Sequence, residues 1–470
     1  MPITSPRQMT EKSAWLAWPE RSPGRAVALV AVVFLGAYLA SLIWLPKPNG
    51  RIVLGDAVHY YVYLRSAVFD RDLEFQDEYE RIYGPEVKGN YATAWIYEKT
   101  RTGHTRNLMS VGPAIVWAPL YLATTGAVAA ANALGAHYPF DGYGRLFQAS
   151  AGVSGIVAAS VGAWLAFLWA RRVYNARVAI WATLSVWLAS SAVYYSAISP
   201  TYSHAASMLT ASLFCWAWGT SLGRHTARRY ALVGLLGGIT ALVRWQDAIF
   251  LAAPVLEIAW QGIADRGPIA RRTVRAATHL AACAVGALVG LLPQLAVWTV
   301  VYGSPLLVPQ GAGFMQWRSP ALLAVLFSQH GLISWTPIVA LSLVGCVLLW
   351  RTNRLVGAVT AVILAGEWYA NGAVIDWWAG EAFGARRFVS CLPLFVLGLA
   401  ALYDRLPHRR WVRALTIAAI SLNVLLLLQY QVFLKGLRDV APYPEGVYGL
   451  WLARFVVPFE LAAKLWHIVF

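Results

Sequence analysis

The stretch from Arg25 to Trp44 reads RAVALVAVVFLGAYLASLIW and carries one charge, at its first position. Twenty residues of α-helix rise about 30 Å, which is the thickness of the hydrocarbon core of a bilayer. Only helices and closed barrels satisfy their backbone groups in lipid, and the ten-residue alternating pattern of barrel strands does not recur along this chain. The stretch therefore predicts a membrane-spanning helix.

The composition extends this prediction to the whole chain. Its 470 residues are 59% hydrophobic and 13% charged, with a mean hydropathy of +0.54, whereas a globular domain carries about a quarter charged residues. We expect an all-α polytopic membrane protein, with residues 1–470 forming a single transmembrane domain of about 10–13 spanning helices. The candidate spans are 26–46, 147–170, 178–196, 204–222, 231–244, 247–262, 279–301, 331–350, 355–373, 388–403, 412–434 and 449–468.

The formal net charge of +16 has an explanation that does not involve nucleic acid. The arginines cluster in short segments between apolar runs, which is typical of loops retained in the cytoplasm. These basic segments are 171–177, 224–229, 266–275, 351–354 and 405–413. We therefore place residues 1–25 in the cytoplasm as a tail. The aromatic segments 194–204, 302–320 and 371–387 are expected on the outer side.

Two segments interrupt the regular alternation of sides. Residues 231–262 are flanked by basic loops at both ends and contain Arg244-Trp245-Gln246-Asp247. A charge at the bilayer centre costs about 2.5–3.5 kcal/mol on insertion scales, so we expect two short helices that meet at this tetrapeptide. A full span over 110–133 would reverse the side of Arg171 to Arg177, so a re-entrant or interfacial helix is expected there.

Residues 47–110 form the predicted first periplasmic loop, which holds nine of the 22 acidic residues. Between Gly55 and Phe69, apolar and aromatic residues recur on one helical face, which predicts an amphipathic helix lying on the membrane surface. Asp56 opens this helix. An aspartate at that position caps a helix well, and it is also a carboxylate held at the outer membrane surface. The two roles are compatible.

Several motifs of this chain resemble those of a known enzyme family. Gly55-Asp56, the Tyr60-Tyr61 pair and the outward turn at Tyr194-Tyr195-Ser196 are similar to the glycosyltransferase C superfamily, near its aminoarabinose transferase and protein O-mannosyltransferase branches. The resemblance covers the topology of about the first 260 residues. Ala57 stands where the mannosyltransferases carry a second acidic residue. The resemblance to that branch therefore does not extend to its substrate. The resemblance implies a glycosyltransferase C-type bundle, with surface-lying helices in the first outward loop, that uses polyprenyl-phosphate sugars.

The chemistry of such a donor suits this layout. Its tail stays in lipid and its sugar at the interface, so the catalytic groups must lie at one membrane face. Asp56 is the candidate general base for an acceptor hydroxyl, and Arg244, Arg386 and Arg387 are candidates to bind the lipid phosphate. The alternatives for these arginines are pairing with Asp247 or anchoring at the interface. A direct displacement would invert the anomeric centre.

Other polar and aromatic residues of the outward segments complete the predicted substrate site. His204 and His330 fall at predicted helix starts, and each is alternatively a satisfied structural residue. Trp378 is alternatively part of the aromatic belt. No metal or cofactor is expected, because Asp70-Arg71-Asp72 is better explained as solvated surface charge. The remaining candidate substrate-binding residues are His59, Tyr60, Tyr61 and Glu381.

The sequence therefore predicts an inverting glycosyltransferase at the periplasmic face of a bacterial inner membrane. Its partners would be membrane lipids, a polyprenyl-phosphate-linked sugar donor and a lipid, glycan or protein acceptor, with no nucleic acid. A polymerase or ligase acting on lipid-diphosphate glycans is one alternative, and a lipid or sugar transporter without covalent chemistry is another. The chain has no Gly-x-x-x-x-Gly-Lys-Ser/Thr motif, which disfavours ATP-driven transport.

Overall fold

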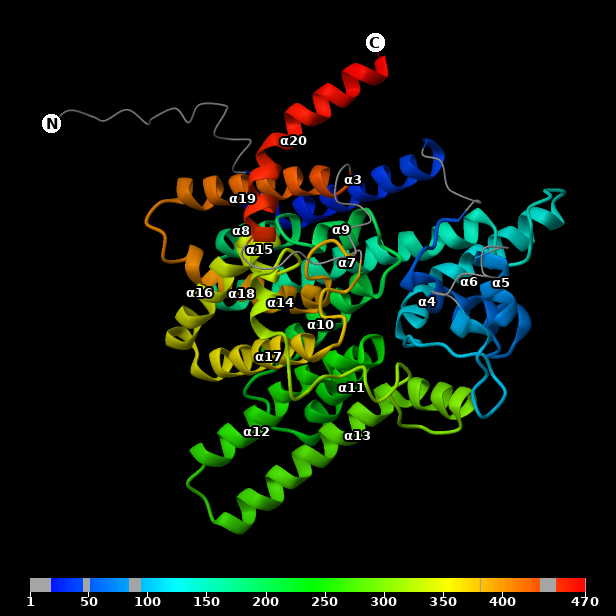
Figure 1. Cartoon of the computed structure of the whole chain (residues 1–470). Coiled ribbons are helices and arrows are strands. Elements are labelled where there is room, and N and C mark those ends of the chain that lie inside the picture. The colour runs from blue at the N-terminus through cyan, green and yellow to red at the C-terminus, as the bar shows by residue number, and fades with distance from the viewer. Residues whose placement is uncertain (1–17, 45–50, 84–93, 381, 432–444, 470) are drawn as a thin grey trace.

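The computed structural model describes residues 18–44, 51–83, 94–380, 382–431 and 445–469. These residues form a helical molecule (Figure 1), in which β pairing within the described ranges is limited to two isolated bridges, Lys99 with Thr105 and Met315 with Val374. Seven of the described helices are long and apolar enough to cross a membrane. The chain is an all-α polytopic membrane protein, as its apolar runs predicted.

These seven helices are α3 (Pro23–Trp44), α6 (Gly112–Ala133), α7 (Arg145–Val173), η5 with α12 (Trp245–Ala264), α13 (Ile269–Tyr302), η6 with α18 (Arg386–Tyr403) and α19 (Arg409–Gln429). An eighth is counted if α14 and α15, which together cover Leu322–Trp335, form one broken span with α16 (Pro337–Thr352), to which they are bent by 99°. This number is below the 10–13 expected from the sequence. The 13 residues of α8 (Ala176–Leu188) are too few to cross about 30 Å alone.

The remaining described elements do not combine the length and the apolar composition of these candidate spans. They are α2 (Trp18–Arg21), α4 (Asp56–Arg65), the π-helix η2 (Ser66–Asp70), α5 (Gln76–Tyr83), η4 (Ala94–Tyr97), α9 (Ala192–Ala197), α10 (Ser203–Thr220), α11 (Ala227–Val243), α17 (Arg354–Ala373) and α20 (Glu445–Val469). Within the broken span, α14 covers Leu322–Phe327 and α15 covers Leu332–Trp335.

The helix α7 forms the centre of the bundle, because its small residues let neighbouring helices approach closely. It packs against α3, α6, α8, α10 and α18. A Cβ added at Gly162 would lie 2.8 Å from the backbone oxygen of Met208 in α10. Close backbone contact of this kind is the usual means of packing helices in membranes, where the hydrophobic effect between helices is weak.

The structure shows the predicted interruption at Arg244, and it shows a continuous helix in the region of the second interruption. The helix α11 ends at Val243, Arg244 is extended with φ −146° and ψ 115°, and η5 starts at Trp245. The break therefore lies at the predicted tetrapeptide. The helix α6, in contrast, is continuous over 22 residues and apolar enough to cross a membrane. It has no break of the kind that a re-entrant segment needs, whereas the interfacial helix that was also expected for 110–133 would be continuous, as α6 is.

The first loop also differs from its prediction. The helix α4 was expected to lie on the membrane surface with one face exposed, yet every residue from Ala57 to Leu64 is buried. Tyrosine hydroxyls on different faces of α4 find partners inside the protein, which accounts for this burial: Tyr60 contacts Ser203, Tyr61 donates to the Gly142 oxygen and Tyr63 donates to the Met109 oxygen. The elements α4, α5 and α6 lie together at one side of the molecule (Figure 1).

Candidate active site

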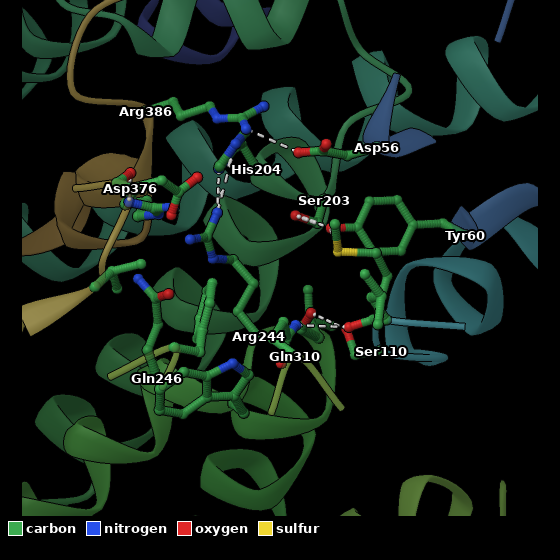
Figure 2. A pocket seen from close by; sticks show the side chains of 17 residues that line it. Asp56, Tyr60, Ser110, Ser203, His204, Arg244, Gln246, Gln310, Asp376 and Arg386 are labelled. Carbon is green, nitrogen blue, oxygen red and sulfur yellow. Dashed lines mark hydrogen bonds and ion pairs between the residues drawn. The ribbon is translucent and has the colours of Figure 1, made fainter. Parts of the chain in front are cut away.

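A cavity of about 250 Å³ lies where segments distant in the sequence converge. The start of α4, the start of α10, the break after α11 and the start of η6 each contribute a charged or polar side chain (Figure 2). The lining residues are Asp56, Tyr60, Leu108, Met109, Ser110, Ser203, His204, Val243, Arg244, Trp245, Gln246, Gln310, Phe314, Val374, Asp376, Arg386 and Arg387. Asp56 and the three arginines singled out in the sequence thus share one cavity.

Asp56 is bound directly to one of these arginines. Its Oδ2 lies 2.8 Å from Nη2 of Arg386, and the side chain of Asp56 remains 33% exposed toward the cavity. The Arg386 guanidinium also lies 5.3 Å from the centre of the Tyr202 ring, at cation–π distance. The N-cap of α4 is Gly55 and Asp56 is the first residue of the helix, so Asp56 does not occupy the capping position considered for it.

The position of Asp56 depends on the glycine before it. Gly55 has φ +56° and ψ −136°, a backbone conformation that L side chains rarely adopt. A Cβ at this position would lie 2.5 Å from the Tyr202 hydroxyl. Glycine therefore permits both the sharp entry into α4 and the close approach of Tyr202.

The electrostatic surroundings keep Asp56 ionised. Burial raises the pKa of the Asp56 carboxyl, but the positive charges of Arg386, His59 and Arg387 lower it more, and the net pKa falls below the ordinary value. Burial also lowers the pKa of His59 to about 4, against the opposing effect of Asp56. Because His59 is then neutral at pH 7, the two arginines provide the stabilisation there. Asp56 is available as a proton acceptor at neutral pH.

The second arginine of the pair has its own carboxylate. Arg387 Nη2 lies 2.7 Å from Asp376 Oδ1, and its Nη1 donates to the Asp376 backbone oxygen at 2.8 Å. The Asp376 side chain is 43% exposed. Two arginine–carboxylate pairs therefore stand side by side in the cavity, contributed by η6, α4 and the segment that follows α17.

The third arginine has a neutral partner. Nη1 of Arg244 donates to Nδ1 of His204, and this nitrogen must be unprotonated to accept. His204 is held between aromatic rings, 4.5 Å from Tyr195 and 6.3 Å from Tyr202 between ring centres. Ser207, rather than Arg244, donates to the carboxylate of Asp247. Arg244 thus makes no direct ion pair with Asp247, and the two groups act on each other through their charges alone.

Tyr60 is the remaining predicted residue in the cavity, where its hydroxyl donates to Ser203 at 3.1 Å. The other predicted residues lie outside the lining. His59 contacts the Tyr79 hydroxyl at 2.9 Å, and Tyr61 donates to the Gly142 oxygen at 2.6 Å. Both side chains belong to α4 and bind it to neighbouring segments in the interior of the protein.

His330 and Trp378 are also outside the cavity lining, and Glu381 lies outside the described residues. His330 is buried, with its ring centre 5.7 Å from that of Trp335. Trp378 packs edge-on against Trp377 at 5.7 Å. Neither ring nitrogen of His330 has a hydrogen-bond partner among the described residues, which differs from the satisfied structural residue given as its alternative.

The sequence did not single out Asp376, Ser203, Gln246 or Gln310. Asp376 had a recognisable signal, since it is an acid within the outward segment 371–387, next to Trp377-Trp378. Gln310 had none. It reaches the cavity because its side chain donates to the Leu108 oxygen at 2.7 Å, and because Arg106 donates to the neighbouring Pro309 oxygen at 3.1 Å.

One acidic group outside the cavity has the spacing of a metal site. The carboxylates of Asp70, Asp77 and Glu78 lie within 4.8 Å of one another. Arg65 already supplies a cation, paired with Asp70 and 3.3 Å from Glu78. Burial and the neighbouring Asp77 raise the pKa of Glu78 to about 9, so this carboxyl is protonated at neutral pH. The arrangement fits an arginine-centred cluster better than a metal ion.

Comparison of the chain with protein-family models and with curated proteins gives no match.

Proposed function

We propose that this protein is an inverting membrane glycosyltransferase that moves a sugar from a polyprenyl-phosphate donor to a hydroxyl acceptor. The observation that supports the proposal most is the ion pair of Asp56 with Arg386 in a cavity that also holds Arg244 and Arg387. A base for the acceptor and cations for the leaving phosphate are the two things this reaction needs.

The proposed step is a single displacement. The acceptor oxygen attacks the anomeric carbon while its proton passes to Oδ1 of Asp56, the oxygen that does not contact Arg386 in the ion pair. The bond between the anomeric carbon and the phosphate oxygen breaks, and its electron pair stays on the phosphate. The products are an inverted glycoside, a polyprenyl phosphate with one additional negative charge and a protonated Asp56.

The ion pair couples the two halves of this step. While Asp56 is ionised, it holds Arg386 at 2.8 Å. When Asp56 takes the proton, Arg386 loses its counter-charge at the moment the phosphate gains one. The guanidinium then becomes available to the leaving group, with which it can form two parallel hydrogen bonds. The charge change is thus compensated between neighbouring groups without uptake of an ion.

The size of the cavity limits the sugar. Drug-sized ligands occupy pockets of about 300–1,000 Å³, and this cavity of about 250 Å³ is smaller. We infer that one sugar ring and its phosphate fill it, which favours a monosaccharide donor over a preassembled lipid-linked glycan. The acceptor would be a lipid, glycan or protein at the periplasmic face of a bacterial inner membrane.

The decisive experiment compares two isosteric changes in the cavity. Wild type, Asp56→Asn and Asp376→Asn are purified in lipid nanodiscs, supplied with polyprenyl-phosphate monosaccharides and assayed for release of polyprenyl phosphate. Asp56→Asn is expected to lose turnover by at least about 10³-fold, combining general-base and charge contributions. Asp376→Asn is expected to keep measurable turnover with weaker donor binding, because Asp376 only positions Arg387.

The outcome also separates the alternative functions. Turnover retained in folded Asp56→Asn protein rejects the assignment of the base. Release of polyprenyl diphosphate from a diphosphate donor would indicate a polymerase or ligase instead. Movement of intact lipid-linked sugar between leaflets, with no product formed, would indicate a transporter. The melting temperature of each variant provides the control for folding.

A further inference from the structure

Two carboxyl groups are buried next to the cavity without lining it. Asp247 belongs to η5 and Glu367 to α17, and the exposed fraction of each residue is 0%. The neighbouring Gln246, which does line the cavity, donates to Asn371 of α17 at 3.0 Å. A polar network therefore extends from the cavity wall into the helical bundle. Ionisable groups at such positions are costly, so their presence calls for an explanation.

One oxygen of each carboxyl group has an ordinary donor. The Ser207 hydroxyl donates to Asp247 Oδ2 at 2.7 Å, and Asn371 Nδ2 donates to Glu367 Oε2 at 3.2 Å. The other oxygens, Asp247 Oδ1 and Glu367 Oε1, are buried and receive no normal hydrogen bond from a donor of the described residues.

Asp247 and Glu367 lie close enough for their side chains to act directly on each other. An ionised carboxylate only accepts hydrogen bonds, so contact between two carboxyl groups requires a proton between them. Two adjacent buried anions would also repel each other strongly. The geometry therefore calls for one proton and one negative charge on the pair.

The groups that face the pair come from four elements. Arg244, at the break before η5, is the cation that acts on both carboxyls. Ser207 faces the pair from α10, Asn371 from α17, and Ser390 and Cys391 from η6. Ser390 and Cys391 lie in the same element as Arg386 and Arg387. Among these neighbours, Arg244 is the only charged side chain.

We infer that Asp247 and Glu367 share one proton and act as a single buried anion that positions Arg244 in the cavity. The other two cavity arginines have carboxylate partners, Arg386 with Asp56 and Arg387 with Asp376. Within the cavity, Arg244 contacts neutral His204. The buried acid pair supplies the counter-charge of Arg244 from the side away from the cavity. The role of Arg244 in binding the donor phosphate rests on the proposed function. The sharing of a proton between Asp247 and Glu367 does not.

Infrared difference spectroscopy tests the proton without any substrate. Purified wild type, Glu367→Gln and Asp247→Asn are compared at pH 8 in the region where a protonated carboxylic acid absorbs. The band of one protonated carboxyl in wild type is expected to disappear in both variants, because either amide donates to the remaining carboxylate. Glu78→Gln serves as the control, since it removes a different protonated carboxyl and should leave this band unchanged. The comparison is therefore repeated in the Glu78→Gln background. There, a band that survives either Glu367→Gln or Asp247→Asn, or the absence of any such band before these substitutions, would overturn the inference.

Donor kinetics test the effect on Arg244. In Glu367→Gln the side-chain amide replaces the shared proton and one negative charge remains, so the donor KM should stay within about threefold of wild type. Glu367→Leu leaves Asp247 Oδ1 without a donor and should raise the donor KM at least tenfold, about the loss of one hydrogen bond to a charged group, with a smaller change in kcat.

Equal KM values for the two variants would contradict the positioning role. If wild type transfers no sugar at all, the proposed function fails while the infrared result still decides whether the proton is shared. The two conclusions can thus fail independently.

Discussion

At the scale of single residues, the cavity joins each charged group to a partner that controls it. The basicity of Asp56 depends on Arg386, because burial and this guanidinium act on the carboxyl in opposite directions. Arg387 is oriented by Asp376, and Arg244 by His204. The chemical properties of the site therefore belong to pairs rather than to individual side chains, and changing one partner should change the behaviour of the other.

A first prediction concerns pH. Since the pKa of Asp56 is lowered in the folded protein, its carboxylate persists through the neutral range, and the acid limb of kcat/KM should fall below about pH 4, the ordinary aspartate value. In Arg386→Gln, burial becomes the main influence on the pKa of Asp56 and raises it. The acid limb of kcat/KM should therefore move toward neutral pH by at least about one pH unit, equal to 1.4 kcal/mol. The measurement is the pH profile of kcat/KM.

The same substitution should alter stability in a defined direction. A carboxyl with a lowered folded-state pKa stabilises the protein above its unfolded-state pKa and loses this contribution as pH falls through the folded value. Arg386→Gln removes that contribution at neutral pH. Arg354→Gln, an exposed arginine at the start of α17, is the control and should leave the profile unchanged. An acid limb that stays in place in Arg386→Gln would exclude Arg386 as the group that lowers the pKa of Asp56.

A second prediction concerns Gly55. Gly55→Ala should reduce turnover by at least about tenfold, because a strained backbone conformation costs roughly 1–3 kcal/mol and the new Cβ would displace Tyr202. Gly223→Ala is a matched control, since Gly223 also has positive φ, at +86°, but has open space around it. Both variants should melt at lower temperature, and only Gly55→Ala should lose activity. Equal activities would show that the approach of Tyr202 is unimportant.

At the scale of elements, the break between α11 and η5 presents Arg244 and Gln246 to the cavity and Asp247 to the interior. A continuous helix would leave these residues at helical spacing on its surface. A buried ion pair near the other end of α11 fixes the position of the broken segment. Arg229 binds Glu257 of α12 through two contacts, at 2.7 and 3.0 Å, and Trp218 donates to the same carboxylate at 2.9 Å.

The third prediction follows from this pair. Arg229 and Glu257 have side-chain exposures of 6% and 1%, and removing one partner of a buried pair costs about 3–5 kcal/mol. Glu257→Gln should therefore lower the melting temperature of the detergent-solubilised protein by several degrees. Asp265→Asn breaks the exposed pair with Arg275 and should have little effect, as surface pairs contribute about 0–1 kcal/mol. A similar loss in both variants would contradict the structural role assigned to the buried pair.

At the scale of the whole molecule, the cavity and the basic segments lie at opposite ends of the same helices. The helix α10 starts at Ser203 in the cavity and ends before the arginines of 224–229, and α18 leads from the cavity arginines to the segment 405–413. The basic segment 266–275 overlaps the start of α13, whose 34 residues, about 51 Å of helix, lead toward the loop that carries Gln310. From this arrangement the positive-inside rule predicts that the cavity faces the outer side.

The fourth prediction tests this orientation. Single cysteines are introduced at two exposed positions, Ser319→Cys in the loop after α13 and Thr273→Cys near its start. A membrane-impermeant maleimide applied to intact cells should label Ser319→Cys and leave Thr273→Cys unlabelled until the cells are opened. The native cysteines Cys215, Cys283 and Cys391 are buried, which limits background labelling. The reverse pattern would place the cavity in the cytoplasm.

The sequence by itself determined the class of the protein and the ends of many helices. Apolar runs of about 20 residues have few alternatives to a spanning helix, because unsatisfied backbone groups are costly in lipid. The break at Arg244 was predictable for a related reason, since charges avoid the bilayer centre. Asp56 was identified because it follows a glycine at the start of the first predicted loop helix, and Arg244, Arg386 and Arg387 because they depart from the positive-inside trend.

Only the tertiary structure decided how these residues pair and what surrounds them. The burial of α4 depends on partners far along the chain, such as Ser203 for Tyr60 and Gly142 for Tyr61, and no local pattern encodes such contacts. The pairing of Arg387 with Asp376 and the contact of Asp247 with Glu367 likewise arise from the packing of separate helices. Helical periodicity reports what one segment can bury, whereas a site depends on which segments meet.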